Sequence, residues 1–310
     1  MGGAGHGCGP HRQLRMNDFT GFIHLFNLMW SALRLTLPSG LLTPKEVLLL
    51  ARVSRQANEL VSEPGSWPGH VVFTRINLNR AMARLHSATF KQKTLALKRL
   101  FPMQPWKLPR LRGLRIVNLD LSLCGIADAD LASICGLPLT SLDLGMCFDI
   151  TDAGLAVLRH LPLHSLDLSF CVNITDAGLA SIRELPLTRL SLTACPQISD
   201  AGMTHLHGLS LETLDLGECD KITDAGLACF GNMPLTSLNL HFCNITDADL
   251  YTLRGLSLTC LDISLCGNIT DAGLAHLRGL PLKTLNVRSC MRLTAAGLAD
   301  LRARGVRVEF

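Results

Sequence analysis

The chain has 310 residues, of which 48% are hydrophobic, 5% are aromatic and 17% are charged. This length allows one large domain or two modest ones, and the scarcity of aromatic residues argues against a single aromatic-rich core. Residues 1–119 carry a net charge of +13 and residues 120–310 a net charge of −9. The overall charge of +4 is therefore no guide to the partner.

Residues 1–18 are rich in Gly and His, and we expect a disordered tail there. Phe19–Leu35 is the only long apolar segment, but it contains His24, Asn27 and Arg34. It is shorter than the roughly 20 apolar residues that a membrane-spanning helix needs. No small-residue cleavage site follows it, so an amphipathic helix is expected rather than a signal peptide. No membrane partner is predicted.

A second helix is expected to begin at Thr43-Pro44, because proline is favoured in the first helical turn. It contains Leu48–Asn58, LLLARVSRQAN, which is followed by Leu60 and Trp67. This pattern resembles an F-box, the short helical motif that docks to the Skp1 adaptor of cullin-based ubiquitin ligases. We assign the helical module to residues 19–70. The alternative is a helical cap for the following domain, with no adaptor.

The F-box resemblance implies a Skp1-like adaptor and a cullin complex as partners. It implies adaptor contacts by the following residues: Leu37, Pro38, Leu41, Leu42, Pro44, Val47, Leu50, Val53, Ser54, Asn58, Leu60 and Trp67.

No acidic residue lies between Glu63 and Asp120, and this stretch holds eleven Lys and Arg residues. Phe90, Phe101 and Trp106 could stack on bases, but the pattern matches no known nucleic-acid-binding module. We therefore expect these charges to coat an outer surface, and nucleic acid is the less favoured partner.

Cysteines recur at steps of 23 or 24 residues, which is typical of a solenoid. They are Cys124, Cys147, Cys171, Cys195, Cys219, Cys243, Cys266 and Cys290. In the unit Leu142–Leu163, alternation turns Leu142 and Leu144 inward and Asp143 to the open face. Thr151 then provides an N-cap, and Pro162 is expected to end the helix after Leu161.

This unit resembles the cysteine-containing leucine-rich repeat over residues 120–301. The resemblance implies an α/β solenoid with a curved parallel sheet inside and short helices outside. The cysteine follows the second inward leucine, where a small apolar side chain suits a turn inside the core. Eight aligned thiols without histidine do not form a zinc site, so no metal or cofactor is expected. Free thiols indicate a reducing compartment, the cytoplasm or the nucleus.

The repeat phase extends to both ends. Subtracting 24 residues from Leu119 gives Leu95, and a second subtraction gives Val71. We therefore assign two degenerate capping repeats to residues 71–118, ahead of the cysteine-containing repeats at 119–310. Val306–Phe310 is predicted to be a final strand with charged residues that protect the sheet edge.

The open face carries a column of five aspartates, which favours a basic protein partner. Solvent-exposed aspartate between leucines is also common in such repeats. Whether the aspartate column takes part in binding therefore stays open. The predicted substrate-binding residues are Asp143, Asp167, Phe170, Arg189, Thr193, Asp215, Glu218, Asn239, His241, Phe242, Asp262 and Arg288.

The chain has no nucleophile paired with a base by motif and no phosphate-binding glycine loop, so an enzyme is not expected. The sequence therefore predicts the substrate-recognition subunit of a Skp1–cullin–F-box ubiquitin ligase. The alternative is a free-standing leucine-rich-repeat scaffold or inhibitor with no ubiquitin role.

Overall fold

The computed structural model describes residues 70–72, 94–96, 111 and 116–310. The chain divides into two compact units, Met1–Pro68 and Gly69–Phe310, and every described residue lies in the second. The predicted tail, the helical module up to residue 69 and all the predicted adaptor-binding residues lie outside the described residues. Most of the predicted capping repeats at 71–118 lie outside them as well.

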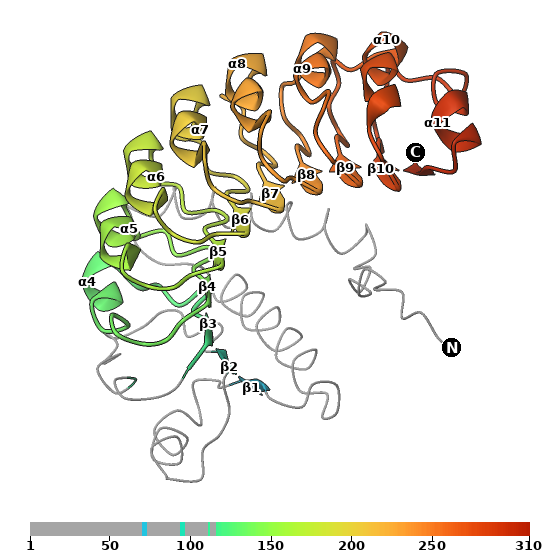
Figure 1. Ribbon diagram of the computed structural model, residues 1–310. Coiled ribbons are helices and arrows are strands. Elements are labelled where there is room, and N and C mark those ends of the chain that lie inside the picture. The colour runs from blue at the N-terminus through green and yellow to red at the C-terminus, as the bar shows by residue number, and fades with distance from the viewer. Residues whose placement is uncertain (1–69, 73–93, 97–110, 112–115) are drawn as a thin grey trace, which may run out of the picture. The chain divides into compact units, whose positions relative to one another are not determined.

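The described strands form one 11-stranded parallel sheet in which the strands pair in chain order (Figure 1). Each strand is three residues long, and its central residue is the inward apolar one from β3 onward. The strands are β1 (His70–Val72), β2 (Thr94–Ala96), β3 (Asn118–Asp120), β4 (Ser141–Asp143), β5 (Ser165–Asp167), β6 (Arg189–Ser191), β7 (Thr213–Asp215), β8 (Ser237–Asn239), β9 (Cys260–Asp262), β10 (Thr284–Asn286) and β11 (Arg307–Glu309).

The strand register follows the predicted repeat phase. The Cα of Val71 pairs with that of Leu95, and Leu95 pairs with Leu119. At the other end Leu285 pairs with Val308, so the predicted final strand is confirmed.

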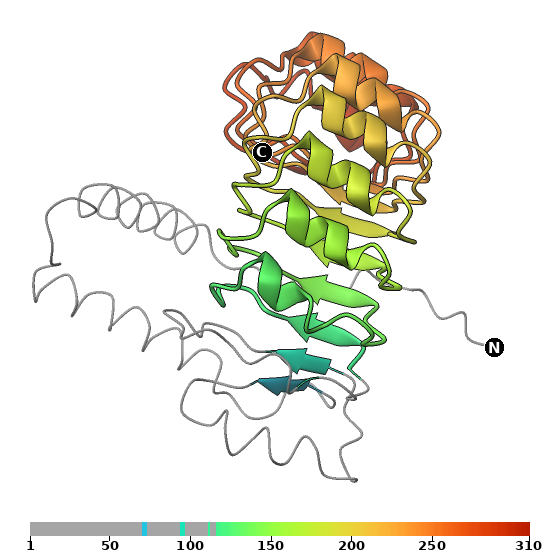
Figure 2. The ribbon, with the colours of Figure 1, turned by 90° about the vertical axis from the view of Figure 1, so that its left-hand side faces the viewer.

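Short helices lie on the outer side of the sheet, one for each repeat, in residues 116–310 (Figures 1 and 2). They are α4 (Asp128–Leu131), α5 (Asp152–Leu158), α6 (Asp176–Ile182), α7 (Asp200–Leu206), α8 (Asp224–Leu227), α9 (Asp247–Thr252), α10 (Asp271–Leu274) and α11 (Ala299–Ala303), with 3-10 segments η2 (Ala228–Phe230) and η3 (Ala275–Gly279). The predicted α/β leucine-rich-repeat solenoid is confirmed.

Helix α5 is shorter than the sequence predicted. It ends at Leu158, not at Leu161. The N–H of Leu161 donates to the carbonyl of Leu158, a three-residue spacing that closes a tight turn before Pro162 is reached.

The Thr-Asp-Ala-Gly motif and its close variants link most of the described repeats to the next. Thr175 caps α6 by accepting the N–H of Ala177, as predicted for this position. Asp152 of the preceding repeat accepts both the N–H and the hydroxyl of Thr175, at 2.8 and 2.6 Å. Gly178 is required because a Cβ there would collide with the Asp152 carboxylate. The motif is therefore an inter-repeat hydrogen-bonding device.

The repeat containing α9 makes this connection differently. Asp249 occupies the glycine position, is buried, and accepts the N–H and the hydroxyl of its own Thr246, each at 2.6 Å. The side-chain carboxylate of Asp224, in the preceding repeat, accepts only the N–H of Ala225 among the described residues. A carboxylate within the repeat has therefore replaced the one from the previous repeat.

The eight cysteines of the repeat are buried free thiols, so their predicted place in the core is confirmed. Cys195 is typical: its Sγ donates to the carbonyl of Leu168 in the previous repeat at 3.2 Å. Burial raises the pKa of the Cys147 and Cys195 thiols to about 12. These sulfurs are unreactive at neutral pH and serve to pack and hydrogen-bond the stack.

Among the described residues, no helix combines the length and the apolar character that crossing a bilayer requires.

Candidate functional site

The concave face of the sheet is the candidate site, because side chains at the first and third positions of each strand point to it. The predicted aspartate column stands at the third position. Asp143 Oδ1 accepts the N–H of Gly145 at 2.9 Å, and Asp167 Oδ1 accepts the N–H of Ser169 at 2.8 Å. These carboxylates therefore stabilise the turn after their own strand, and a role in binding stays a prediction.

A left-handed residue follows each of these turns. The backbone φ lies between 54° and 61° at Leu123, Met146, Phe170, Ala194, Glu218, Phe242, Leu265 and Ser289. This conformation costs a non-glycine residue roughly 1–2 kcal/mol. Sheet hydrogen bonding holds it in place: the N–H of Phe170, for example, donates to the carbonyl of Thr193 at 2.7 Å.

Amide side chains bridge neighbouring strands toward the C-terminal end of the stack. Asn239 Nδ2 donates to Asp215 Oδ2 at 3.0 Å, and Asn286 Nδ2 donates to Asp262 Oδ2 at 2.7 Å. Each amide thereby occupies the second oxygen of a neighbouring carboxylate, which leaves these two aspartates less able to bind a partner.

A second group of polar contacts lies beside these bridges. His241 Nδ1 is 2.8 Å from Ser264 Oγ, and this hydroxyl donates to Asp262 Oδ1 at 2.5 Å. Arg288 pairs with Glu309 at 3.4 Å, with both side chains partly exposed. The charge of Arg288 is thus already compensated, so it is a weaker candidate for binding than its position suggested.

Three large apolar side chains are exposed in the loops that follow β8, β9 and β10. The exposed fractions are 53% for Phe242, 43% for Leu265 and 86% for Met291. Phe242 and Leu265 occupy equivalent left-handed positions in adjacent repeats, and Met291 lies in the next repeat. We call these three residues the carboxyl-edge patch.

Glu218 lies in the repeat before this patch, at the position equivalent to Phe242. Partial burial raises the pKa of its carboxyl group, and the neighbouring His241 opposes that effect. A cationic partner group at this point would compensate the carboxylate charge, whose partial burial is unfavourable.

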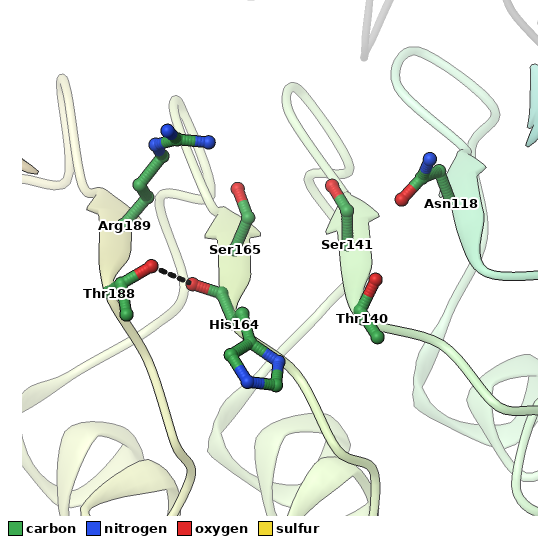
Figure 3. A pocket seen from close by; sticks show the side chains of 7 residues that line it. All are labelled: Asn118, Thr140, Ser141, His164, Ser165, Thr188 and Arg189. Atoms are coloured by element: carbon green, nitrogen blue, oxygen red, sulfur yellow. Dashed lines mark hydrogen bonds between the residues drawn. The ribbon is translucent and has the colours of Figure 1, made fainter.

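A depression of about 390 Å³ lies at the opposite, amino-terminal edge of the strands (Figure 3). Its lining is polar and contains no acidic residue: Asn118, Thr140, Ser141, His164, Ser165, Thr188 and Arg189. We call it the amino-edge pocket. Arg189 is the only cationic Lys or Arg side chain in this lining.

The structure brings the predicted substrate-binding residues together unevenly. Those of the C-terminal repeats lie along the carboxyl edge of β7–β10: Asp215, Glu218, Asn239, His241, Phe242, Asp262 and Arg288. Asp143, Asp167, Phe170 and Thr193 lie on or just after β4–β6, and Arg189 lies at the other edge. Leu265, Met291, Ser141 and Ser165 were not predicted. The sequence offered a signal for one of them, because Leu265 stands at the repeat position equivalent to that of Phe242.

No group of three or more His, Cys, Asp or Glu side chains within the described residues could hold a metal ion. The concave face and its carboxyl edge carry polar, charged and apolar side chains that a macromolecule could contact. Extended concave surfaces of solenoids are well suited to such binding.

Comparison with known proteins agrees with the repeat assignment. A family model described as "Leucine Rich repeat" matches at residues 160–182, 209–231, 231–253 and 256–277. The chain thus contains leucine-rich repeats. Among curated proteins there is no match.

Among solved structures, 36 chains match. One belongs to the crystal structure of the Rad7 and Elc1 complex in yeast, with a TM-score of 0.56 and 16% sequence identity. The match covers 77% of this chain and 73% of that chain. With identity this low, the structural similarity shows a shared fold alone.

Proposed function

We propose that this protein is a non-enzymatic substrate-recognition subunit of a Skp1–cullin–F-box type ubiquitin ligase, acting in the cytoplasm or the nucleus. Residues 19–70 would dock the Skp1-like adaptor, and the concave face would hold the target protein. The protein would then promote catalysis by proximity, because it holds a target lysine near another protein's ubiquitin-charged enzyme.

The carboxyl-edge patch is the observation that carries target binding. Single exposed apolar side chains are ordinary on protein surfaces. Here Phe242, Leu265 and Met291 come from three consecutive repeats and lie beyond the same edge of the sheet. Aromatic and aliphatic side chains grouped in this way, with polar residues around them, are typical anchors of protein interfaces.

The charges near the patch favour a basic target segment. Glu218 has a raised pKa caused by partial burial, and Asp220 is exposed two residues later. The nearby cation Arg288 is already paired with Glu309. A segment that presents an apolar side chain to the patch and a Lys or Arg to Glu218 would therefore be complementary.

The adaptor half of the proposal rests on the F-box resemblance of Leu48–Asn58 ahead of the repeats. The structural neighbour with the same fold comes from a two-protein complex, which supports the idea that a repeat protein of this kind works within an assembly.

Binding of the purified full chain to immobilised Skp1 tests the adaptor half. We expect the wild type to bind and the double variant Leu50→Asp, Val53→Asp not to bind. Tyr251→Asp is the control, because Tyr251 is 56% exposed on α9 and is not one of the predicted adaptor contacts. Failure of the wild type to bind, or retained binding by the double variant, would leave the free-standing scaffold as the better description.

A photo-crosslinking amino acid at position 265 tests the target half in cells. We expect a covalent adduct with a specific protein, and we expect Phe242→Ser to remove it. Tyr251→Ser is the matched control, since Tyr251 and Phe242 are aromatic residues of similar exposure, 56% and 53%, and Tyr251 lies on α9 rather than in the loop after β8. An adduct that is insensitive to Phe242→Ser would show that the patch is not the docking surface.

A further inference from the structure

The amino-edge pocket holds a row of hydrogen-bond donors that the carboxyl-edge patch does not use. Ser141, Ser165 and Arg189 are the first residues of β4, β5 and β6, and their Cα atoms pair directly across the sheet. Neighbouring strands are ~4.8 Å apart, so the row spans about 10 Å. All three side chains are at least partly exposed.

These three donors are uncommitted in the described part of the chain. Arg189 has no carboxylate within ion-pair distance there, and the hydroxyls of Ser141 and Ser165 make no hydrogen bond there. Nearby hydroxyls differ. Thr188 donates to the carbonyl of His164 at 3.2 Å, as Figure 3 shows. A row of hydrogen-bond donors without acceptors, next to hydroxyls that already have one, is suited to binding an anion.

The aspartate column does not cancel this preference. Asp143 and Asp167 lie two residues further along the same strands, about 7 Å away. Each turns one oxygen to the carboxyl edge, where it accepts the N–H of Gly145 or Ser169. The third position of β6, the strand of Arg189, is Ser191, so no carboxylate lies on the same strand as Arg189.

We propose that the amino-edge pocket binds a phosphoryl group on a serine or threonine of the target protein. A phosphate ester is a dianion near neutral pH and has three terminal oxygens. The guanidinium of Arg189 can donate two parallel hydrogen bonds, and the two serine hydroxyls can each donate one. A carboxylate has one charge and two oxygens, and so fits this row less completely. The binding of a phosphoryl group by this pocket does not depend on the proposed function. Only the statement that a target protein carries the group rests on that function.

Backbone amide NMR of the full chain, titrated with three probes, tests the proposal without adaptor or target. The probes are N-acetylphosphoserine amide, N-acetylglutamate amide and inorganic phosphate. We expect saturable shifts of the Ser141, Ser165 and Arg189 amides with the phosphoserine probe, and at least tenfold weaker binding of the glutamate probe. Arg189→Gln should weaken phosphoserine binding by about tenfold or more, because a hydrogen bond between charged groups is lost.

Arg307→Gln is the matched control. Arg307 is also an exposed arginine at the first position of a strand, but it lies on β11, outside the pocket, so this variant should bind as the wild type does. No saturable shifts, equal binding of the glutamate probe, or unchanged binding by Arg189→Gln would each overturn the proposal. Binding of inorganic phosphate without the phosphoserine probe would also overturn it, because the source would then be the free ion. Failure of the Skp1 assay would leave this result unaffected.

Discussion

The inter-repeat carboxylates allow a controlled test of what holds the solenoid together. Asp176 accepts the N–H and the hydroxyl of Ser199 in the next repeat, at 2.8 and 2.6 Å. A hydrogen bond to a charged group contributes about 1.5–3 kcal/mol, with less at a half-exposed site. We therefore expect Asp176→Ala to lower the free energy of unfolding by about 2–4 kcal/mol.

Asp224→Ala is the matched control for this substitution. Asp224 stands at the same position of α8, but Asp249 has taken over its partner Thr246. Both variants lose a first-turn carboxylate, which contributes about 0.3–1 kcal/mol through the helix dipole. The difference between them therefore isolates the inter-repeat hydrogen bonds, and Asp224→Ala should cost at most about 1 kcal/mol.

Transplanting the α9 arrangement extends the test. Gly202→Asp alone should destabilise strongly, because a Cβ at Gly202 collides with the Asp176 carboxylate. Combined with Asp176→Ala, the new carboxylate has room to accept from Ser199, as Asp249 does from Thr246. The double variant should then be more stable than the sum of the single changes predicts, by about 1.5 kcal/mol or more.

Urea unfolding followed by far-UV circular dichroism is the suitable assay, because none of the three tryptophans lies in residues 120–310, which contain these repeats. Equal losses for Asp176→Ala and Asp224→Ala, or strict additivity in the double variant, would refute the reasoning.

Four further predictions concern the thiols and two single positions. Iodoacetamide at pH 8 should modify the exposed Cys135 and leave Cys195 intact, as read by peptide mass spectrometry, since burial raises the pKa of Cys195 to about 12. Because unfolding would release that proton, stability should fall as the pH rises above about 9, and a flat profile would contradict this. Ala194→Gly should raise the unfolding free energy by about 0.5–1 kcal/mol, since φ is 54° there; a loss would show that the turn is unstrained. Hydrogen bonds from Thr294 lower the pKa of Asp271, so stability should decline as the pH falls below about 4 in the wild type but less in Asp271→Asn.

The repeat phase made the sheet predictable from the sequence. With a period of two along each strand, only one register turns Leu119 and Val308 inward, and the observed pairing follows it. Helix ends were less predictable: α5 stops at Leu158 because a tight turn forms before Pro162.

The candidate site was predictable only in part. The acceptor role of Asp152 involves Thr175 of the next repeat, and such a contact is not visible until the repeats are stacked. The left-handed turn at Phe170 lacks the glycine or asparagine that usually indicates it. Nothing in the sequence therefore indicated that this column lies in the loops beyond the strands and not on the sheet.

The two proposed contact regions also constrain the spacing of a target segment. Arg189 on β6 and Phe242 after β8 are two repeats apart across the sheet, about 10 Å. Phe242 lies five residues beyond Ser237, the β8 residue in register with Arg189, which corresponds to about 16 Å along the strand. The diagonal is about 19 Å, which an extended chain covers in about six residues. Peptides with phosphoserine and a leucine separated by six residues should therefore bind more tightly than those separated by one residue. If affinity did not depend on the spacing, the two regions could not be serving one segment, because only simultaneous contact makes linker length matter.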